Sequence, residues 1–148
     1  MRHNSASILF VAMSHQLSSE QIESAQHTLG INSIVLLSDL NASLSEQMGQ
    51  IPAHWETHDI IGLAKQIVAE ADKSLATHFC CLCQPSLFLW ANLIASGRAH
   101  FINPAFGSYK LICVESTTER ISTETKLNDG SVIKTSTFRH VQWRKIFE

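Results

Sequence analysis

The chain has 148 residues and a mass of 16.5 kDa, which is enough for one hydrophobic core and too little for two. Hydrophobic residues make up 45% and charged residues 16% of it, so it is neither a disordered chain nor a disulfide-rich miniprotein. The formal net charge of −2 and the pI near 6.4 argue against a general binder of RNA or duplex DNA, because such proteins present a strongly basic surface.

The chain begins with a predicted strand, helix and strand. The apolar run 8–13 is followed by polar residues and predicts a strand buried on both faces. Ser18 and Gln21 have the spacing of a capping box at the start of a helix, and Gly30 is placed to end it. The run 34–37 predicts the second strand. A strand, helix and strand in this order indicate a parallel sheet.

The middle of the chain repeats this alternation. Segment 38–57 is polar and irregular, and we interpret it as a surface connection with a short helix near 42–50. Positions 58–74 have the apolar spacing of an amphipathic helix, and 78–83 predicts a third strand. Residues 87–96 are apolar nearly all round, which predicts a well-buried helix.

The last part of the chain changes in character. Residues 98–110 contain Pro and Gly and predict a loop, followed by a fourth strand at 111–115. Residues 121–127 and 132–147 flank an Asp-Gly turn and predict a long β-hairpin. Simple alternation places His140 and Trp143 on opposite faces of its second strand.

Charge is distributed unevenly along the chain. Residues 1–119 hold five Lys/Arg and ten Asp/Glu, a balance of −5, whereas residues 120–148 hold six and three, a balance of +3. We therefore expect a single domain over 1–148, with an acidic body and a basic hairpin extension over 119–148. Its fold class is α/β, with a mostly parallel sheet flanked by helices and a C-terminal hairpin.

Three polar clusters follow predicted strands, at 14–15, 84–86 and 116–120. Ligands of open parallel sheets bind beyond the carboxyl ends of the strands, and a helix N-terminus such as the one after Gln84 attracts phosphate groups. We therefore expect a site for a small oligoanion such as a nucleotide at this edge.

Cofactor and metal chemistry have weak support in the sequence. There is no Gly-rich phosphate loop of the dinucleotide or Walker kind, and we predict no cofactor. The cysteines at 80, 81 and 83 would lie on both faces of one strand, so we favour reduced, buried core cysteines over a metal or redox centre. The eight histidines are scattered, and we predict no metal site.

We expect a cytoplasmic protein with no membrane partner. No apolar run approaches the roughly 20 residues that a membrane-spanning helix needs, and the polar start of the chain is unlike a secretion signal.

The chain resembles a known family, the small CRISPR-associated ring nucleases of type III systems. The resemblance covers about half of the chain and rests on residues 9–15 with 17–22, on Gln84, and on the tail pattern formed by 116–120, 129–130 and 138–144. These enzymes are Rossmann-like relatives of CARF sensor domains that bind and open cyclic oligoadenylate second messengers. One departure is Pro85-Ser86, where relatives tend to have Gly and an acidic residue.

The resemblance implies metal-independent RNA cleavage, in which a ribose 2′-hydroxyl attacks the adjacent phosphodiester and leaves a 2′,3′-cyclic phosphate. It implies general acid/base catalysis by His15, charge stabilisation by Arg120, and hydrogen bonds from Ser14 to phosphate or ribose oxygens. The ligand-binding residues that it implies are Gln84, Pro85, Ser86, Thr117, Thr118, Arg139 and His140.

Several alternatives stay open at this point. Ser14 can simply start a turn, His15 can be a solvent-exposed loop residue, and Arg120 can pair with a carboxylate near the base of the hairpin. The basic side chains of the hairpin can cover the ligand of their own subunit or that of a partner, or the hairpin can serve mainly in packing.

The partner and the activity have alternatives as well. A cyclic ligand with rotational symmetry fits a two-fold homodimer, and cyclic tetra-adenylate fits it best. A non-catalytic cyclic-oligoadenylate binding protein is the alternative to an enzyme, and a structural or interaction domain without any nucleotide is the third hypothesis.

Overall fold

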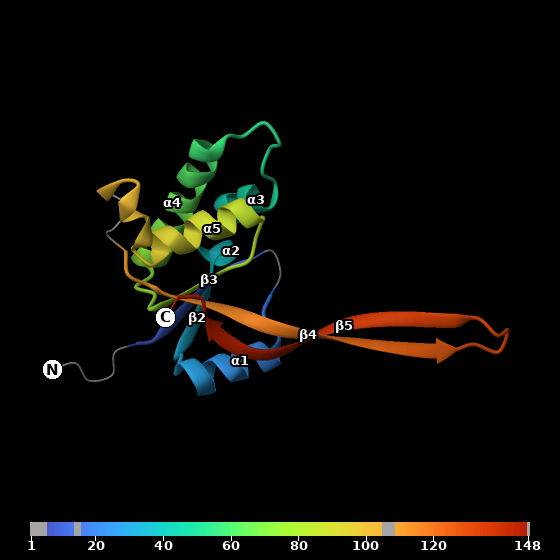
Figure 1. Ribbon diagram of the computed structural model, residues 1–148. Helices are drawn as coiled ribbons and strands as arrows, with labels where there is room; N and C mark the ends of the chain where they lie inside the picture. Colours follow the sequence, from blue (N-terminus) through green and yellow to red (C-terminus); the bar gives the residue numbers. More distant parts are fainter. Residues whose placement is uncertain (1–5, 14–15, 105–108, 148) are drawn as a thin grey trace.

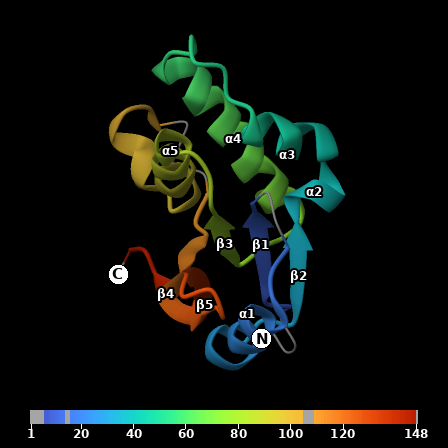
Figure 2. The same cartoon turned by 90° about the vertical axis from the view of Figure 1, so that its right-hand side faces the viewer.

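The computed structural model describes residues 6–13, 16–104 and 109–147 (Figure 1). It has a five-stranded sheet with the strand order β2-β1-β3-β4-β5, in which the first four strands are parallel and β5 is antiparallel to β4. Helices α2 to α5 lie on one face of the sheet and α1 lies on the other (Figure 2). This confirms the predicted α/β class with a mostly parallel sheet and a C-terminal hairpin. The strands are β1 (Ile8–Ala12), β2 (Ser33–Leu36), β3 (His78–Cys81), β4 (Ile112–Lys126) and β5 (Val132–Lys145).

The first strand, helix and strand form as predicted. Helix α1 (Ser19–Ser24) begins with the expected capping box, because the Ser18 hydroxyl accepts the Gln21 N–H at 3.1 Å and the Gln21 side-chain oxygen accepts the Ser18 N–H at 2.8 Å. The helix continues as a π-helical turn, η1 (Ala25–Leu29), and ends at Gly30 with φ +67°. A left-handed backbone at this position favours glycine. Strands β1 and β2 then pair in parallel.

The main core lies between the sheet and helices α4 (Thr57–Lys73) and α5 (Pro85–Ala95). Phe10 of β1 and Phe79 of β3 are fully buried side by side, with ring centroids 5.9 Å apart and nearly parallel planes. Leu63 of α4 packs into the same cluster. Each such side chain contributes about 1.5–3 kcal/mol through its burial.

Two predictions about the helices need correction. The predicted surface connection 38–57 contains α3 (Ala42–Gly49), as expected, but also a short helix, α2 (Leu37–Leu40), just before it. Helix α5 is buried on one side only, and Leu89 is 53% exposed on the other. The apolar residues 87–96 thus form a helix that packs on the sheet with one face, while its other face is exposed. The predicted loop after α5 contains a short 3-10 helix, η2 (Arg98–Phe101).

The predicted fourth strand and the hairpin are one continuous structure. Strand β4 runs straight through the cluster 116–120, which we had expected to follow a strand. Hydroxyl-bearing and β-branched residues suit a strand, and each residue of this cluster finds a partner in β5. The prediction ended the strand too early because the pairing of β4 with β5 extends it, and local periodicity does not reveal pairing with a distant segment.

A β-bulge interrupts the β4–β5 ladder between Thr117 and Thr118. Thr117 pairs with Gln142 and Thr118 with His140, so Val141 is the extra residue on β5. As a result His140 and Trp143 lie on the same face, with ring centroids 5.6 Å apart. Our prediction of opposite faces was wrong, because a bulge shifts the alternation by one residue.

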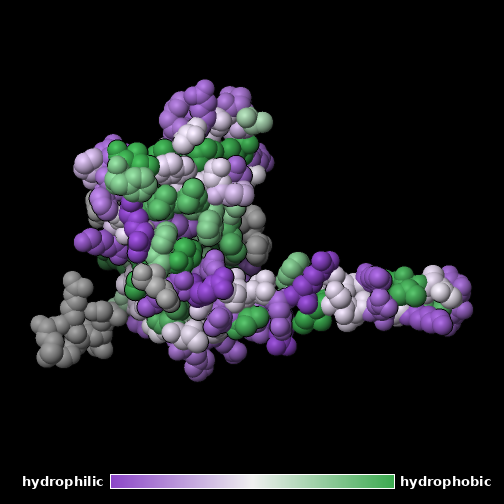
Figure 3. All heavy atoms as spheres, in the orientation of Figure 1, coloured by the Kyte–Doolittle hydropathy of each residue, from purple (hydrophilic) through white to green (hydrophobic). Residues whose placement is uncertain are grey.

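Beyond the bulge the two strands project from the body as a ribbon (Figures 1 and 3). We call residues 118–139 the arm; every one of them is exposed. The remainder of the described chain is the body. Phe138, at the base of the arm, is 72% exposed, although it is a large aromatic residue.

The cysteines are reduced and mostly buried, as predicted. Cys80, Cys81 and Cys113 are buried, and no cysteine forms a disulfide. Burial raises the pKa of the Cys80 and Cys113 thiols to about 12, so both are protonated and unreactive at neutral pH. Within the described residues, no helix is long and apolar enough to cross a membrane.

Candidate functional site

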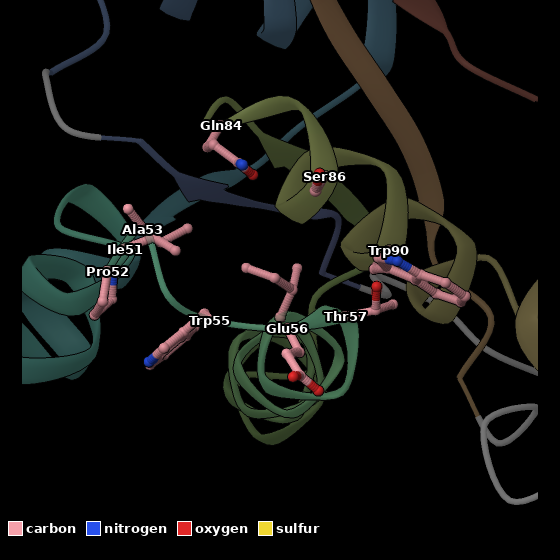
Figure 4. Close-up of a pocket in the computed structure, with 10 residues that line it drawn as sticks. Ile51, Pro52, Ala53, Trp55, Glu56, Thr57, Gln84, Ser86 and Trp90 are labelled. Atoms are coloured by element: carbon pink, nitrogen blue, oxygen red, sulfur yellow. The ribbon is translucent and has the colours of Figure 1, made fainter.

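The candidate site lies at the carboxyl edge of the parallel strands. Strands β1 and β3 are neighbours in the sheet although β2 lies between them in sequence, so the strand order reverses between β1 and β3. Ligands of open α/β sheets bind at such a point. A cavity of about 260 Å³ opens here between the N-terminus of α5 and the segment that leads into α4 (Figure 4).

The cavity walls come from two segments, 51–60 and 84–90. Gln84, Ser86 and Trp90 belong to the start of α5, and the opposite wall carries Trp55 and Glu56 just before α4 (Figure 4). The other lining residues are Ile51, Pro52, Ala53, Thr57 and Ile60. The wall thus combines two indole rings with amide, hydroxyl and carboxylate groups.

A second cavity of about 350 Å³ adjoins the first, because Ile51 and Gln84 line both. It is bounded by the end of α3 and by Leu82 and Cys83, which directly follow β3. Gln84 therefore stands between two neighbouring hollows at the end of the central strand.

Local hydrogen bonds fix the position of Gln84. Its side-chain oxygen accepts the N–H of Leu87 at 3.0 Å and so caps α5, with Pro85 in the first turn. The N-cap is thus Gln84, and Ser86 lies in the first turn of the helix. Pro85 has no N–H, and Gln84 itself uses that of Leu87, so few donors of this helix end remain for a ligand.

The charge of the cavity walls is negative. Among the described lining residues of the two cavities, Glu56 is the only charged side chain and none is Lys, Arg or His. A polyanionic ligand at this edge therefore needs cations from elsewhere. The arm carries basic residues that are one possible source of such cations.

A partly buried polar cluster joins the base of the arm to α1. The Gln21 side-chain amide donates to the Ser116 hydroxyl at 3.1 Å, and this hydroxyl shares a hydrogen bond of 2.5 Å with Nδ1 of His140. The indole N–H of Trp143 donates to the main-chain oxygen of Gln21 at 3.0 Å. These contacts fasten both strands of the hairpin to the body.

His140 is 7% exposed, and its environment favours the neutral ring. Burial lowers its pKa below the usual 6.5, and the carboxylate of Glu20 opposes this shift in part. Its Nε2 atom is buried and has no hydrogen-bond partner among the described residues. In this environment the imidazole hydrogen-bonds to the Ser116 hydroxyl through Nδ1 and packs beside Trp143.

The predicted site residues fall into separate groups. Ser14 and His15 lie outside the described residues. Gln84, Pro85 and Ser86 are at the carboxyl edge, and Gln84 and Ser86 line the cavity. The others are on the hairpin: Thr117, Thr118, Arg120, Arg139 and His140.

The hairpin residues are not brought to the cavity of their own chain. The described lining residues of both cavities come from the body, and none comes from β4 or β5. Thr117 exchanges hydrogen bonds with the backbone of Gln142. Arg139 forms an ion pair of 3.3 Å with Glu119, and Arg120 is exposed opposite Phe138.

Sequence reasoning missed one wall of the cavity. Ile51, Trp55, Glu56 and Thr57 lie in or next to the segment that we interpreted as a surface connection. The sequence did contain a signal. Trp55 lies three residues after Pro52 in a polar stretch, and a tryptophan is uncommon in a simple surface loop because this residue is usually buried.

Comparison with known proteins places the chain in a family. The model of the "Uncharacterized protein MJ1673 family" matches residues 7–144, and the chain therefore belongs to this family. The match includes both the body and the arm. Neither the curated proteins nor the solved structures contain a match to the chain.

Proposed function

We propose that this member of the MJ1673 family is a ring nuclease, which binds cyclic oligoadenylate at the carboxyl edge of its sheet and opens the ring. The preferred ligand is cyclic tetra-adenylate, and its cleavage switches off type III CRISPR signalling. The proposal joins the sequence resemblance to the position and the chemistry of the cavity.

The observation that carries the proposal is the pair of tryptophans in a cavity at the switch point of the sheet. Trp55 and Trp90 line the cavity on opposite sides, together with Gln84 and Ser86 of the α5 N-terminus. Purine bases stack on indole rings, with about 1–3 kcal/mol per base. Two adjoining cavities of about 260 and 350 Å³ suit a ligand made of repeated nucleotide units better than a single compact molecule.

The proposed reaction needs no metal. The 2′-oxygen of one ribose attacks the neighbouring phosphorus, the bond to the 5′-oxygen breaks, and a proton moves from the 2′-hydroxyl to the leaving 5′-oxygen. The products are a 2′,3′-cyclic phosphate and a 5′-hydroxyl. Holding the three reacting atoms in line contributes about 7–11 kcal/mol in well-oriented reactions. We assign the proton transfer to His15 and charge stabilisation to Arg120.

A homodimer is part of this proposal. A ring of four identical nucleotides has rotational symmetry, and a two-fold axis through the ring presents the same groups to each half. The dimer also addresses the shortage of positive charge at the cavity walls, because a second chain brings a second arm.

A specific observation favours a second candidate, a protein that binds the ring without cutting it. The described cavity walls contain no His, Lys or Arg, so acid/base and charge-stabilising groups must all come from outside the described walls. In that case the protein sequesters the messenger.

Incubation of the purified protein with labelled cyclic tetra-adenylate in EDTA distinguishes the two candidates. The nuclease predicts more than one ring opened per protein dimer, with 2′,3′-cyclic phosphate ends. Intact ligand that stays bound refutes the nuclease and supports sequestration. The cyclic tetra-deoxyadenylate analogue, which lacks the nucleophile, must bind and remain uncut.

Variants test the assigned residues. We expect Trp55→Leu to weaken ligand binding by roughly tenfold or more, from the loss of one stacked base. Phe101→Leu, an exposed aromatic at the opposite end of α5, is the matched control and leaves binding unchanged. His15→Ala and Arg120→Ala slow cleavage more than they weaken binding; equal losses in both would remove these two assignments.

A further inference from the structure

A further cavity lies at the other end of the sheet from the candidate site. Its volume is about 500 Å³, and it opens where β4 begins at Ile112 and β5 ends at Lys145. Because Ile112 pairs with His78, the first residue of the parallel strand β3, this is the amino edge of the sheet. Figure 1 shows the start of β4 on the side of the body away from the tip of the arm. This amino-edge cavity shares no described lining residue with the two cavities of the candidate site.

The described walls of the amino-edge cavity are cationic. They include Arg98 of η2 and Lys145 of β5, and none of the described lining residues is Asp or Glu. Within the described part of the chain, neither cation forms an ion pair with a carboxylate. By contrast Arg144, the residue before Lys145, is paired with Glu115. Two cations without a nearby counter-charge attract an anion.

Much of the remaining wall is apolar. Leu111, Ile112 and Phe147 line it, and Ile112 is 42% exposed although it lies in a strand of the sheet. An apolar group in the cavity would remove this surface from water, which favours binding. Small-molecule sites typically have this size and combine apolar walls with a few polar or charged groups.

The Arg98 guanidinium is held at the cavity by an aromatic ring. Its carbon atom Cζ lies 4.6 Å from the centroid of the Phe147 ring, a distance at which the face of the ring attracts a cation. A guanidinium in contact with a ring can still donate from its edge to two oxygens of a carboxylate or phosphate. The contact therefore positions a donor group without occupying its hydrogen bonds.

The combination of charge and apolar surface defines a class of ligand. An inorganic anion would meet the two cations but leave the apolar wall in contact with water. A neutral apolar molecule would cover that wall but leave the cations unused. A molecule that joins one acidic group to an apolar body contacts both parts of the cavity.

We propose that the amino-edge cavity binds a small organic acid. Its carboxylate or phosphate group contacts Arg98 and Lys145, and its apolar body packs on Ile112 and Phe147. This site is separate from the proposed nuclease site at the carboxyl edge, and it does not depend on that function.

NMR titration of the isotope-labelled wild-type protein tests the site, with octanoate and octyl phosphate as probes. We expect the amide signals of Ile112 and Cys113 to shift and the amide signal of Gln84 to stay in place. Octan-1-ol lacks the acidic group, and acetate and inorganic phosphate lack the apolar body, so each should bind at least tenfold more weakly. The tighter of the two acids identifies the preferred head group.

Single substitutions test the two cations. Arg98→Gln and Lys145→Gln should each weaken binding of the tighter acid by roughly fivefold or more, because each removes a charge-assisted contact. The matched control is Lys126→Gln, which removes the same charge from the arm and should change binding less than twofold. All three side chains are exposed, so urea denaturation should give wild-type stability for each variant.

Several results would overturn the proposal. These are unchanged signals of Ile112 and Cys113 at millimolar concentrations of both acids, or binding of any of the three simpler probes as tight as that of the acids. Equal weakening by Lys126→Gln would show that overall charge, and not the cavity, attracts the acid. Displacement of the acid by cyclic tetra-adenylate would assign the cavity to the ring and also overturn it. A protein that binds the acid but not cyclic tetra-adenylate refutes the proposed function alone.

Discussion

The same two strands, β4 and β5, have different surroundings in the body and in the arm. Within the body, Val114 of β4 and Trp143 of β5 are buried against β1 and the α1 helix. Within the arm, no residue of either strand is buried. Thr, Val and Ile favour extended backbone in both regions, so the backbone conformation is shared while the burial is not.

This comparison separates what forms a strand from what stabilises it. Cross-strand pairs contribute roughly 0.2–1 kcal/mol each, and ordering each residue costs about 1–2 kcal/mol in backbone entropy. In the body the core offsets this cost. In the arm every residue is exposed, so no buried side chain adds to the cross-strand pairs there.

The largest expected effect comes from two phenylalanines, one in each region. Phe79→Ala in the core should lower the free energy of unfolding by about 3–5 kcal/mol, because it leaves a cavity beside Phe10. Phe138→Ala on the arm should change it by less than about 0.5 kcal/mol. Urea denaturation of both variants measures the contrast. Similar losses in both would mean that the arm is integrated with the core, and would remove the distinction between the regions.

The contacts at the base of the arm should give an intermediate effect. Trp143→Phe keeps an aromatic ring but removes the hydrogen bond from the indole N–H to the main-chain oxygen of Gln21. We expect a loss of about 1–2 kcal/mol in the free energy of unfolding. Hydrogen exchange of the amides of α1 should accelerate together with those of β5 next to the bulge. Acceleration in the arm alone would contradict a role of Trp143 in fastening the hairpin to α1.

The smallest effect is a dependence of stability on pH. The pKa values of His140 and His78 are lowered from 6.5, mainly by burial, and Lys145 adds to the shift at His78. The unfolded chain therefore binds protons at these residues before the folded chain does. The stability is fully present above pH 6.5 and declines as the pH falls from there toward the lowered folded values.

Unfolding free energies measured by urea denaturation between pH 8 and 5 test this dependence. His140→Gln should reduce the slope below pH 6.5, and His78 contributes to the slope that remains. An unchanged slope in His140→Gln would mean that this ring is not held neutral by burial.

Much of the body could be predicted from the sequence because its signals are local. The capping box at Ser18, the left-handed Gly30 and the periodicity of α4 each depend on residues a few positions apart. Continuous apolar runs identified β1 and β3, because strands covered on both faces need apolar residues at every position.

The remainder depends on contacts between distant residues. The bulge at Val141 and the long extension of β4 are properties of the pairing between two strands, and no local pattern marks them. The same holds for the candidate site. Gln84 could be predicted at the end of a central strand, whereas Trp55 reaches the cavity only through the position of α4. The separation of Arg120 from the cavity follows from the arm, whose length became visible only with the structure.

The bulge at Val141 affects the direction of the arm without changing which side chains lie on each face of the ribbon. Bulges bend and twist the strand that carries them, so this one residue, itself 52% exposed, helps to set the angle at which the ribbon leaves the sheet. Its removal would restore a regular ladder and leave every other residue of both strands on the face that it now occupies. Insertion or deletion of this single residue can therefore change the direction of the arm, while the side chains on both faces of the ribbon stay the same.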